Sequence, residues 1–233
     1  MRMTEALSHV GRWDLATDRN EKKSWSEQLS RALAEYVAAN LREGGFENTK
    51  PFPGGAGERA FQGGLGPKKV DVSYADERHG LLLAVSVKTI GYPPFGKNLK
   101  NRFGDLMTEA ITLHMRFPYS VVCALFAFPE AADSDRTPIR RRMSTFDRAC
   151  KLFSLASGRR EYTGPGEKFE NVTAVCYRPI SIGQPEPVIL RMIDCTTLEE
   201  IDETRYFDLL RTIYNERNPH APIGDDFEGF TDE

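Results

Sequence analysis

The chain has 233 residues, enough for one large domain with a proper hydrophobic core, and its 40% hydrophobic and 28% charged residues are ordinary for a globular protein. The sequence has no apolar run near the roughly 18 residues of a membrane helix and no apolar signal segment at its N-terminus, so we expect a cytoplasmic protein. The net charge of −3 excludes indiscriminate binding to nucleic acid but leaves room for a local basic cleft.

The first 22 residues are mixed and polar, and we set residues 1–22 apart as an N-terminal extension. A helix is predicted from Ser24 to about Arg42, because apolar residues recur at helical spacing and two glycines follow. Glu27 stands three residues after Ser24, which is the spacing of a capping box. Capping alone explains this glutamate without any chemistry.

Residues 47–67 contain six glycines and three prolines, which predicts a loop without a regular element. This loop either closes over a nucleic acid or is a plain connection. In the first case Arg59, Lys68 and Lys69 would face phosphates.

Two short runs then have the composition of β-strands, namely residues 70–74 and residues 81–87. A polar turn over residues 76–80 joins them, which predicts an antiparallel hairpin. In such a hairpin the start of the first strand lies beside the end of the second. Asp71 and Lys88 are therefore expected to be neighbours.

The next elements predict a crossover connection. A helix is expected over about residues 99–115, and a fully apolar strand over residues 119–128. A strand, a helix and an apolar strand in this order indicate a parallel pair in a sheet that is covered on both faces. The cations Lys97, Lys100 and Arg102 at the start of the helix oppose its dipole, so they either bind a ligand or form a solvated helix end.

The remaining sequence predicts a helix over about 144–155, strands over 172–177 and 187–193, and a last helix over about 198–216. The basic residues Arg140 and Arg141 are either a solvated surface or a contact with DNA. We therefore predict an α/β fold with a mixed central β-sheet flanked by helices, as one domain over residues 23–220, followed by an acidic tail over residues 221–233. The four cysteines form no CxxC pair and are expected to be reduced thiols in the core.

An acid on one strand and a lysine at the end of the next suit the hydrolysis of a phosphodiester. The carboxylate can hold a divalent cation while the ammonium group orients or activates the attacking water. A cross-strand ion pair on a solvated face would explain Asp71 and Lys88 equally well without chemistry.

Asp71 and the run Ser86-Val87-Lys88 resemble the motif of the PD-(D/E)XK nuclease superfamily, the fold of many restriction endonucleases. The resemblance covers roughly residues 24–128, and Ser86 stands where the family has Asp or Glu. A subgroup with Ser-Val-Lys at this point takes the missing carboxylate from the following helix. The candidates here are Asp105 and Glu109, and the family also places a glutamate such as Glu27 at the metal.

The resemblance implies a restriction endonuclease-like fold and a nuclease that uses Mg²⁺, for which Mn²⁺ can substitute. Asp71 and Glu109 would hold the metal, with Asp105 or Glu27 as further acids. Lys88 would position the nucleophile, and Ser86 would either leave a gap or bond through water. It further implies DNA as the partner, a homodimer, and a role in restriction or anti-phage defence. A nuclease-like binding protein without a metal site, and a repair or RNA-directed nuclease, remain alternatives.

Overall fold

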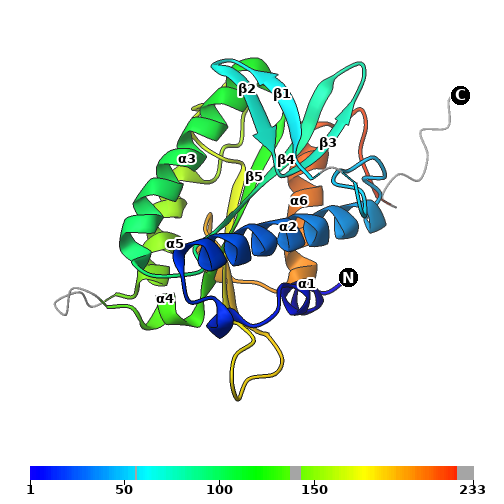
Figure 1. Ribbon diagram of the computed structural model, residues 1–233. Helices are drawn as coiled ribbons and strands as arrows, with labels where there is room; N and C mark the ends of the chain where they lie inside the picture. The colour runs from blue at the N-terminus through cyan, green and yellow to red at the C-terminus, as the bar shows by residue number, and fades with distance from the viewer. Residues whose placement is uncertain (56, 137–142, 225–233) are drawn as a thin grey trace, which may run out of the picture.

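In the computed structural model, which describes residues 1–55, 57–136 and 143–224, a twisted sheet runs through the middle of the protein (Figure 1). The sheet has six strands in the order β3-β4-β5-β6-β7-β8. The central pairs β4–β5 and β5–β6 are parallel, and the outer pairs are antiparallel. The predicted class, an α/β fold with a mixed sheet flanked by helices, is confirmed. The strands are β3 (Val72–Asp76), β4 (Gly80–Thr89), β5 (Val121–Pro129), β6 (Asn171–Arg178), β7 (Val188–Asp194) and β8 (Glu199–Glu200).

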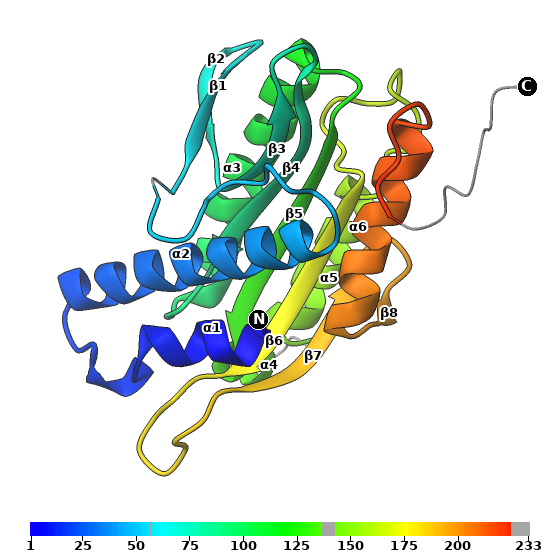
Figure 2. The same cartoon turned by 90° about the vertical axis from the view of Figure 1, so that its right-hand side faces the viewer.

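Helices cover both faces of the sheet (Figure 2). One face packs against α1 (Met3–Val10), α2 (Arg19–Glu43) and α6 (Glu203–Arg217), and the other packs against α3 (Phe95–Arg116) and α5 (Thr145–Ala156). Both cores are built by alternate residues of the same strands, because successive side chains of a strand point to opposite faces. As the sequence predicted, β5 is central, parallel to β4 and completely buried.

The alternation along β4 decides which helix its polar residues meet. Val85 and Val87 belong to the core beneath α2, whereas Ala84 belongs to the core beneath α3. Ser86 and Lys88 have the same parity as Ala84, and their side chains accordingly contact a residue of α3. The strand therefore presents Ser86 and Lys88 to α3, whereas Thr89 has the opposite parity and its hydroxyl contacts Ser30 of α2.

The N-terminal region contains a helix that the sequence analysis did not predict. The helix α1 buries Met3, Ala6, Leu7 and Val10 in the core beneath α2, so residues set apart as an extension contribute to that core. A short 3₁₀ helix, η1 (Trp13–Leu15), follows.

The helix α2 begins at Arg19 rather than at Ser24. Its N-cap is Asp18, whose side chain accepts hydrogen bonds from the backbone N–H groups of Asn20 and Glu21. The Glu21 side chain completes a capping box. The predicted box at Ser24 and Glu27 is therefore wrong, because Asp18 and Glu21 form a capping box further upstream and the helix starts there.

The predicted absence of regular structure over residues 47–67 is also wrong. Strands β1 (Arg59–Gly63) and β2 (Gly66–Val70) form a separate two-stranded antiparallel ribbon. Its turn needs Gly66, which has a φ of +129°. Gly63 lies so close to Thr112 of α3 that a Cβ atom would stand 2.4 Å from its side chain. Glycine here permits a turn and a close approach rather than preventing a strand.

The C-terminal half largely follows the prediction. The helix α5 begins after its N-cap Ser144, while α6 begins later than expected, after its N-cap Asp202, whose side chain accepts a hydrogen bond from the backbone N–H of Arg205. A short helix, α4 (Glu130–Ser134), was not predicted. All four cysteines are buried and free, as expected. Arg140, Arg141 and the end of the acidic tail lie outside the described residues.

No helix in the described ranges is both long enough and apolar enough to span a lipid bilayer.

Candidate functional site

Asp71 lies at the break between two strands, where the chain leaves the ribbon at Val70 and enters the main sheet at Val72. Val72 pairs with Val85, so Asp71 comes opposite the end of β4. There the backbone N–H of Val87 donates a 2.7 Å hydrogen bond to Asp71 Oδ2. The position of the carboxylate is therefore fixed by the backbone of the neighbouring strand.

Lys88 connects this carboxylate to a second one. Its Nζ atom lies 3.2 Å from Asp71 Oδ2 and 3.2 Å from Glu109 Oε2. The exposed fractions of the side chains are 16% for Lys88, 18% for Asp71 and 2% for Glu109. Asp71 and Lys88 are neighbours, as predicted, but their side chains are largely buried and do not lie on a solvated face.

Glu109 is held on both of its oxygens. Ser86 Oγ donates a 2.6 Å hydrogen bond to Oε1, and Lys68 Nζ lies 3.4 Å from Oε2. The serine that replaces the expected strand carboxylate thus bonds directly to the helix carboxylate.

Asp71, Ser86, Lys88, Glu109 and Lys68 thus form one connected cluster. Burial affects the pKa values of Asp71 and Lys88. Burial raises the pKa of the Asp71 carboxyl and outweighs the opposing effect of Lys88. Burial also opposes the charged form of Lys88, but Glu109 and Asp71 together raise the pKa of Lys88 above its usual value. The lysine is therefore a firmly charged group between two carboxylates, one of which ionises reluctantly.

The donor set can hold a divalent cation. A hard ion such as Mg²⁺ is commonly bound by one or two carboxylates together with water and substrate oxygens. Among the described residues no hydrogen bond reaches Asp71 Oδ1, which leaves that oxygen available. The described residues contain no group of three or more His, Cys, Asp or Glu side chains that could bind a metal, so two carboxylates and external oxygens would have to suffice.

The cluster lies at the bottom of a cleft of about 1770 Å³ between α2, the ribbon, the end of β4 and α3. Its lining holds more basic than acidic residues, although the whole chain has a net charge of −3. The basic residues of the lining are Arg19, Lys22, Lys23, Arg31, Lys68, Lys69, Lys88 and Arg102, and the acidic ones are Glu27, Glu35, Glu58, Asp71, Asp105 and Glu109.

The other predicted acids are not in contact with the cluster. Asp105 lines the cleft but is exposed and pairs with Arg102 at 3.3 Å. Glu27 lines the cleft as well, and its nearest ionic partner is Lys23 at 3.7 Å. Of the two helix candidates, only Glu109 meets Lys88 and Ser86.

The predicted phosphate contacts divide into two groups. Lys68, Lys69 and Arg102 line the cleft. Arg59, Lys97 and Lys100 are exposed but lie outside its lining. The sequence analysis missed the basic residues of α2, although three of them, Arg19, Lys23 and Arg31, are spaced in multiples of four and so share a helix face.

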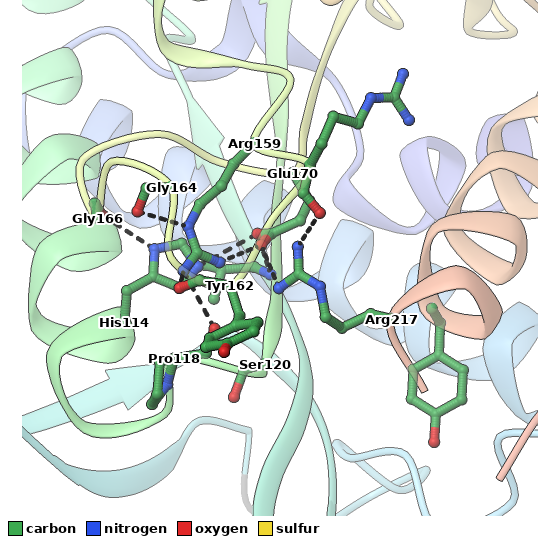
Figure 3. Close-up of polar contacts among 12 residues, drawn as sticks. His114, Pro118, Ser120, Arg159, Tyr162, Gly164, Gly166, Glu170 and Arg217 are labelled. Carbon is green, nitrogen blue, oxygen red and sulfur yellow. Dashed lines mark hydrogen bonds and ion pairs between the residues drawn. The ribbon is translucent and has the colours of Figure 1, made fainter. Parts of the chain in front are cut away.

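A second polar cluster surrounds Glu170 at the start of β6 (Figure 3). Its Oε1 atom accepts a 2.6 Å hydrogen bond from Arg159 and lies 3.1 Å from Arg217 Nη1. Its Oε2 atom accepts a 2.8 Å bond from the backbone N–H of Val122 and lies 3.3 Å from His114 Nε2. All four side chains of this cluster are buried.

The Glu170 cluster joins segments that are distant in the sequence. His114 belongs to the end of α3, Arg159 to the loop after α5, and Arg217 to the end of α6. The partners outweigh desolvation and lower the pKa of Glu170. No substrate can reach a fully buried carboxylate, so we assign this cluster to stability.

Comparisons of the chain with models of protein families, with curated proteins and with solved structures found no match.

Proposed function

We propose that the protein is a magnesium-dependent endonuclease that hydrolyses phosphodiester bonds of DNA. The observation that carries this proposal is the position of Lys88, whose ammonium group lies 3.2 Å from the carboxylates of both Asp71 and Glu109. Two carboxylates and a lysine at the bottom of an open cleft supply the groups that metal-assisted hydrolysis of a phosphodiester requires.

The roles follow from the contacts. Asp71 and Glu109 would hold the cation, which when bound would polarise the phosphate and lower the pKa of the attacking water. Lys88 lies between the two carboxylates, so it is placed to orient the water and to balance negative charge that develops on the phosphate. Ser86 keeps the Glu109 side chain in place through its hydrogen bond.

The cleft supports a nucleic acid as the substrate. Its excess of basic residues attracts a polyanion, while the chain as a whole is slightly acidic, so attraction is confined to one region. Action on foreign DNA in restriction or anti-phage defence, in the cytoplasm and as a homodimer, belongs to the same proposal. The defence role and the homodimer rest on the resemblance of Asp71 and Ser86-Val87-Lys88 to the nuclease motif.

The test is cleavage of plasmid and linear DNA in Mg²⁺ by the wild-type protein and by Asp71→Ala and Lys88→Ala. We expect both variants to lose cleavage, and thermal melting confirms that each variant is folded. Wild-type cleavage rates in either variant would refute the assignment. Parallel assays on RNA decide the substrate, and a wild-type protein that binds DNA without cutting it would be the inactive nuclease-like alternative.

A further inference from the structure

Lys68 is the one member of the cluster that comes from the ribbon. Its Nζ atom lies 3.4 Å from Glu109 Oε2, the same oxygen that Lys88 approaches to 3.2 Å. The side chain of Lys68 is 29% exposed, compared with 16% for Lys88. Lys68 is therefore the more accessible of two lysines that share one carboxylate oxygen, and it lines the cleft.

The charges of the cluster cancel when a second lysine is present. Asp71 and Glu109 contribute two negative charges when ionised, and Lys68 and Lys88 contribute two positive ones. With Lys88 alone the cluster would be negative and would attract a divalent cation. With both lysines in place the cation enters a neutral site and meets repulsion from Lys68 at short range.

A phosphodiester removes this conflict. Its negative oxygen offers Lys68 a new partner, so the lysine can leave Glu109 without losing its ion pair. Glu109 Oε2 is then available to the cation, and the added phosphate partly balances the added metal charge.

We propose that Lys68 is a substrate-binding residue that couples the metal to the DNA. In the free protein it neutralises Glu109, and in the complex it releases Glu109 and binds a phosphodiester oxygen of the DNA backbone. This inference rests on the proposed nuclease function. It implies that metal and DNA strengthen the binding of each other by the same factor.

The alternative role of Lys68 is purely structural, as a partner that stabilises Glu109. The two roles differ in the sign of one measurement. If Lys68 is purely structural, its removal leaves the metal affinity unchanged or lowers it. If Lys68 repels the cation, its removal raises the metal affinity.

The experiment is calorimetric titration of Mn²⁺ into the DNA-free wild type, Lys68→Met and Lys69→Met, with thermal melting to confirm folding. Lys69 is the matched control, because it is the adjacent lysine but is 74% exposed and pairs with Glu58 at 3.2 Å. We expect Lys68→Met to bind Mn²⁺ at least about tenfold more tightly than the wild type. Lys69→Met should change the affinity by less than about twofold, because solvent screens an exposed charge.

The second readout is the affinity for a DNA duplex in the presence and absence of Ca²⁺, followed by fluorescence anisotropy. We expect Lys68→Met to reduce the strengthening of DNA binding by Ca²⁺ at least about fivefold. Lys68→Arg keeps the charge and should bind Mn²⁺ as weakly as the wild type. If Lys68→Met is unstable, Lys68→Gln carries the same expectations.

The outcomes separate this inference from the nuclease proposal. A wild type that binds Mn²⁺ and cleaves DNA, together with a Lys68→Met variant of unchanged Mn²⁺ affinity, overturns the role of Lys68 and leaves the nuclease standing. A wild type that neither binds Mn²⁺ nor cleaves DNA overturns both.

Discussion

Replacing Glu170 with glutamine should destabilise the protein strongly, whereas replacing Asp71 with asparagine should not. Both residues are acids in contact with cations, but their surroundings differ. Glu170 has partners that lower its pKa despite burial, while burial raises the pKa of Asp71 despite Lys88. The protein therefore stabilises the charged form of one acid and disfavours that of the other.

The magnitude follows from the contacts of Glu170. Glutamine removes the charge that faces Arg159 at 2.6 Å and Arg217 at 3.1 Å, and both guanidinium groups then stay buried without a counterion. Removing one member of a buried ion pair costs about 3–5 kcal/mol, which lowers the melting temperature of a domain of this size by about 6–20 °C. Asp71→Asn should change the free energy of unfolding by less than about 1 kcal/mol, or raise it.

The effect of Glu170→Gln should depend on pH. A carboxyl whose pKa is lowered by folding contributes stability that is present above its usual pKa of 4.5 and is lost as the pH falls through the lower value of the folded state. The difference in the free energy of unfolding between wild type and Glu170→Gln should therefore be largest at neutral pH and should decrease in acid. Urea unfolding at about pH 7 and about pH 3 measures both quantities.

Two results would refute this reasoning. A loss below about 1 kcal/mol for Glu170→Gln at neutral pH would mean that the buried cluster does not stabilise the fold. A large loss for Asp71→Asn would make that aspartate a structural residue.

Two further predictions concern the candidate site. Glu109→Gln keeps the shape of the side chain and should lower metal-dependent cleavage by at least about a hundredfold, while adding Ser86→Glu should restore part of the activity. Single-turnover cleavage rates measure both effects. A wild-type rate for Glu109→Gln would disprove the relocated acid. Arg102 lines the cleft and Lys97 and Lys100 lie beside it; if all three contact phosphates, neutralising them together should weaken DNA binding and flatten its dependence on salt by about one unit of slope for each contact that is lost. An unchanged slope would assign the three residues to a solvated surface.

The sequence predicted the main contacts of the site because they follow from strand geometry. Asp71 and Lys88 stand at the open ends of a hairpin whose turn is marked by polar residues, so their proximity depends only on pairing across that turn. Of the two acids that were candidates on the following helix, Glu109 reaches Lys88 in the structure, whereas Asp105 pairs with Arg102.

Other features depended on signals that were overlooked or absent. The apolar spacing of Met3, Leu7 and Val10 would have identified α1. The glycines of the ribbon predict a loop, although in the structure Gly63 permits a close approach to α3. The Glu170 cluster joins residues up to 103 positions apart, and no local pattern relates them.

The most direct test of the account is the position of manganese in a crystal soaked with Mn²⁺, located by anomalous scattering. We predict one ion bound by the carboxylates of Asp71 and Glu109, with Lys88 displaced from at least one of them. A crystal in which Lys88 still bridges both carboxylates, and in which manganese binds elsewhere or not at all, would contradict it.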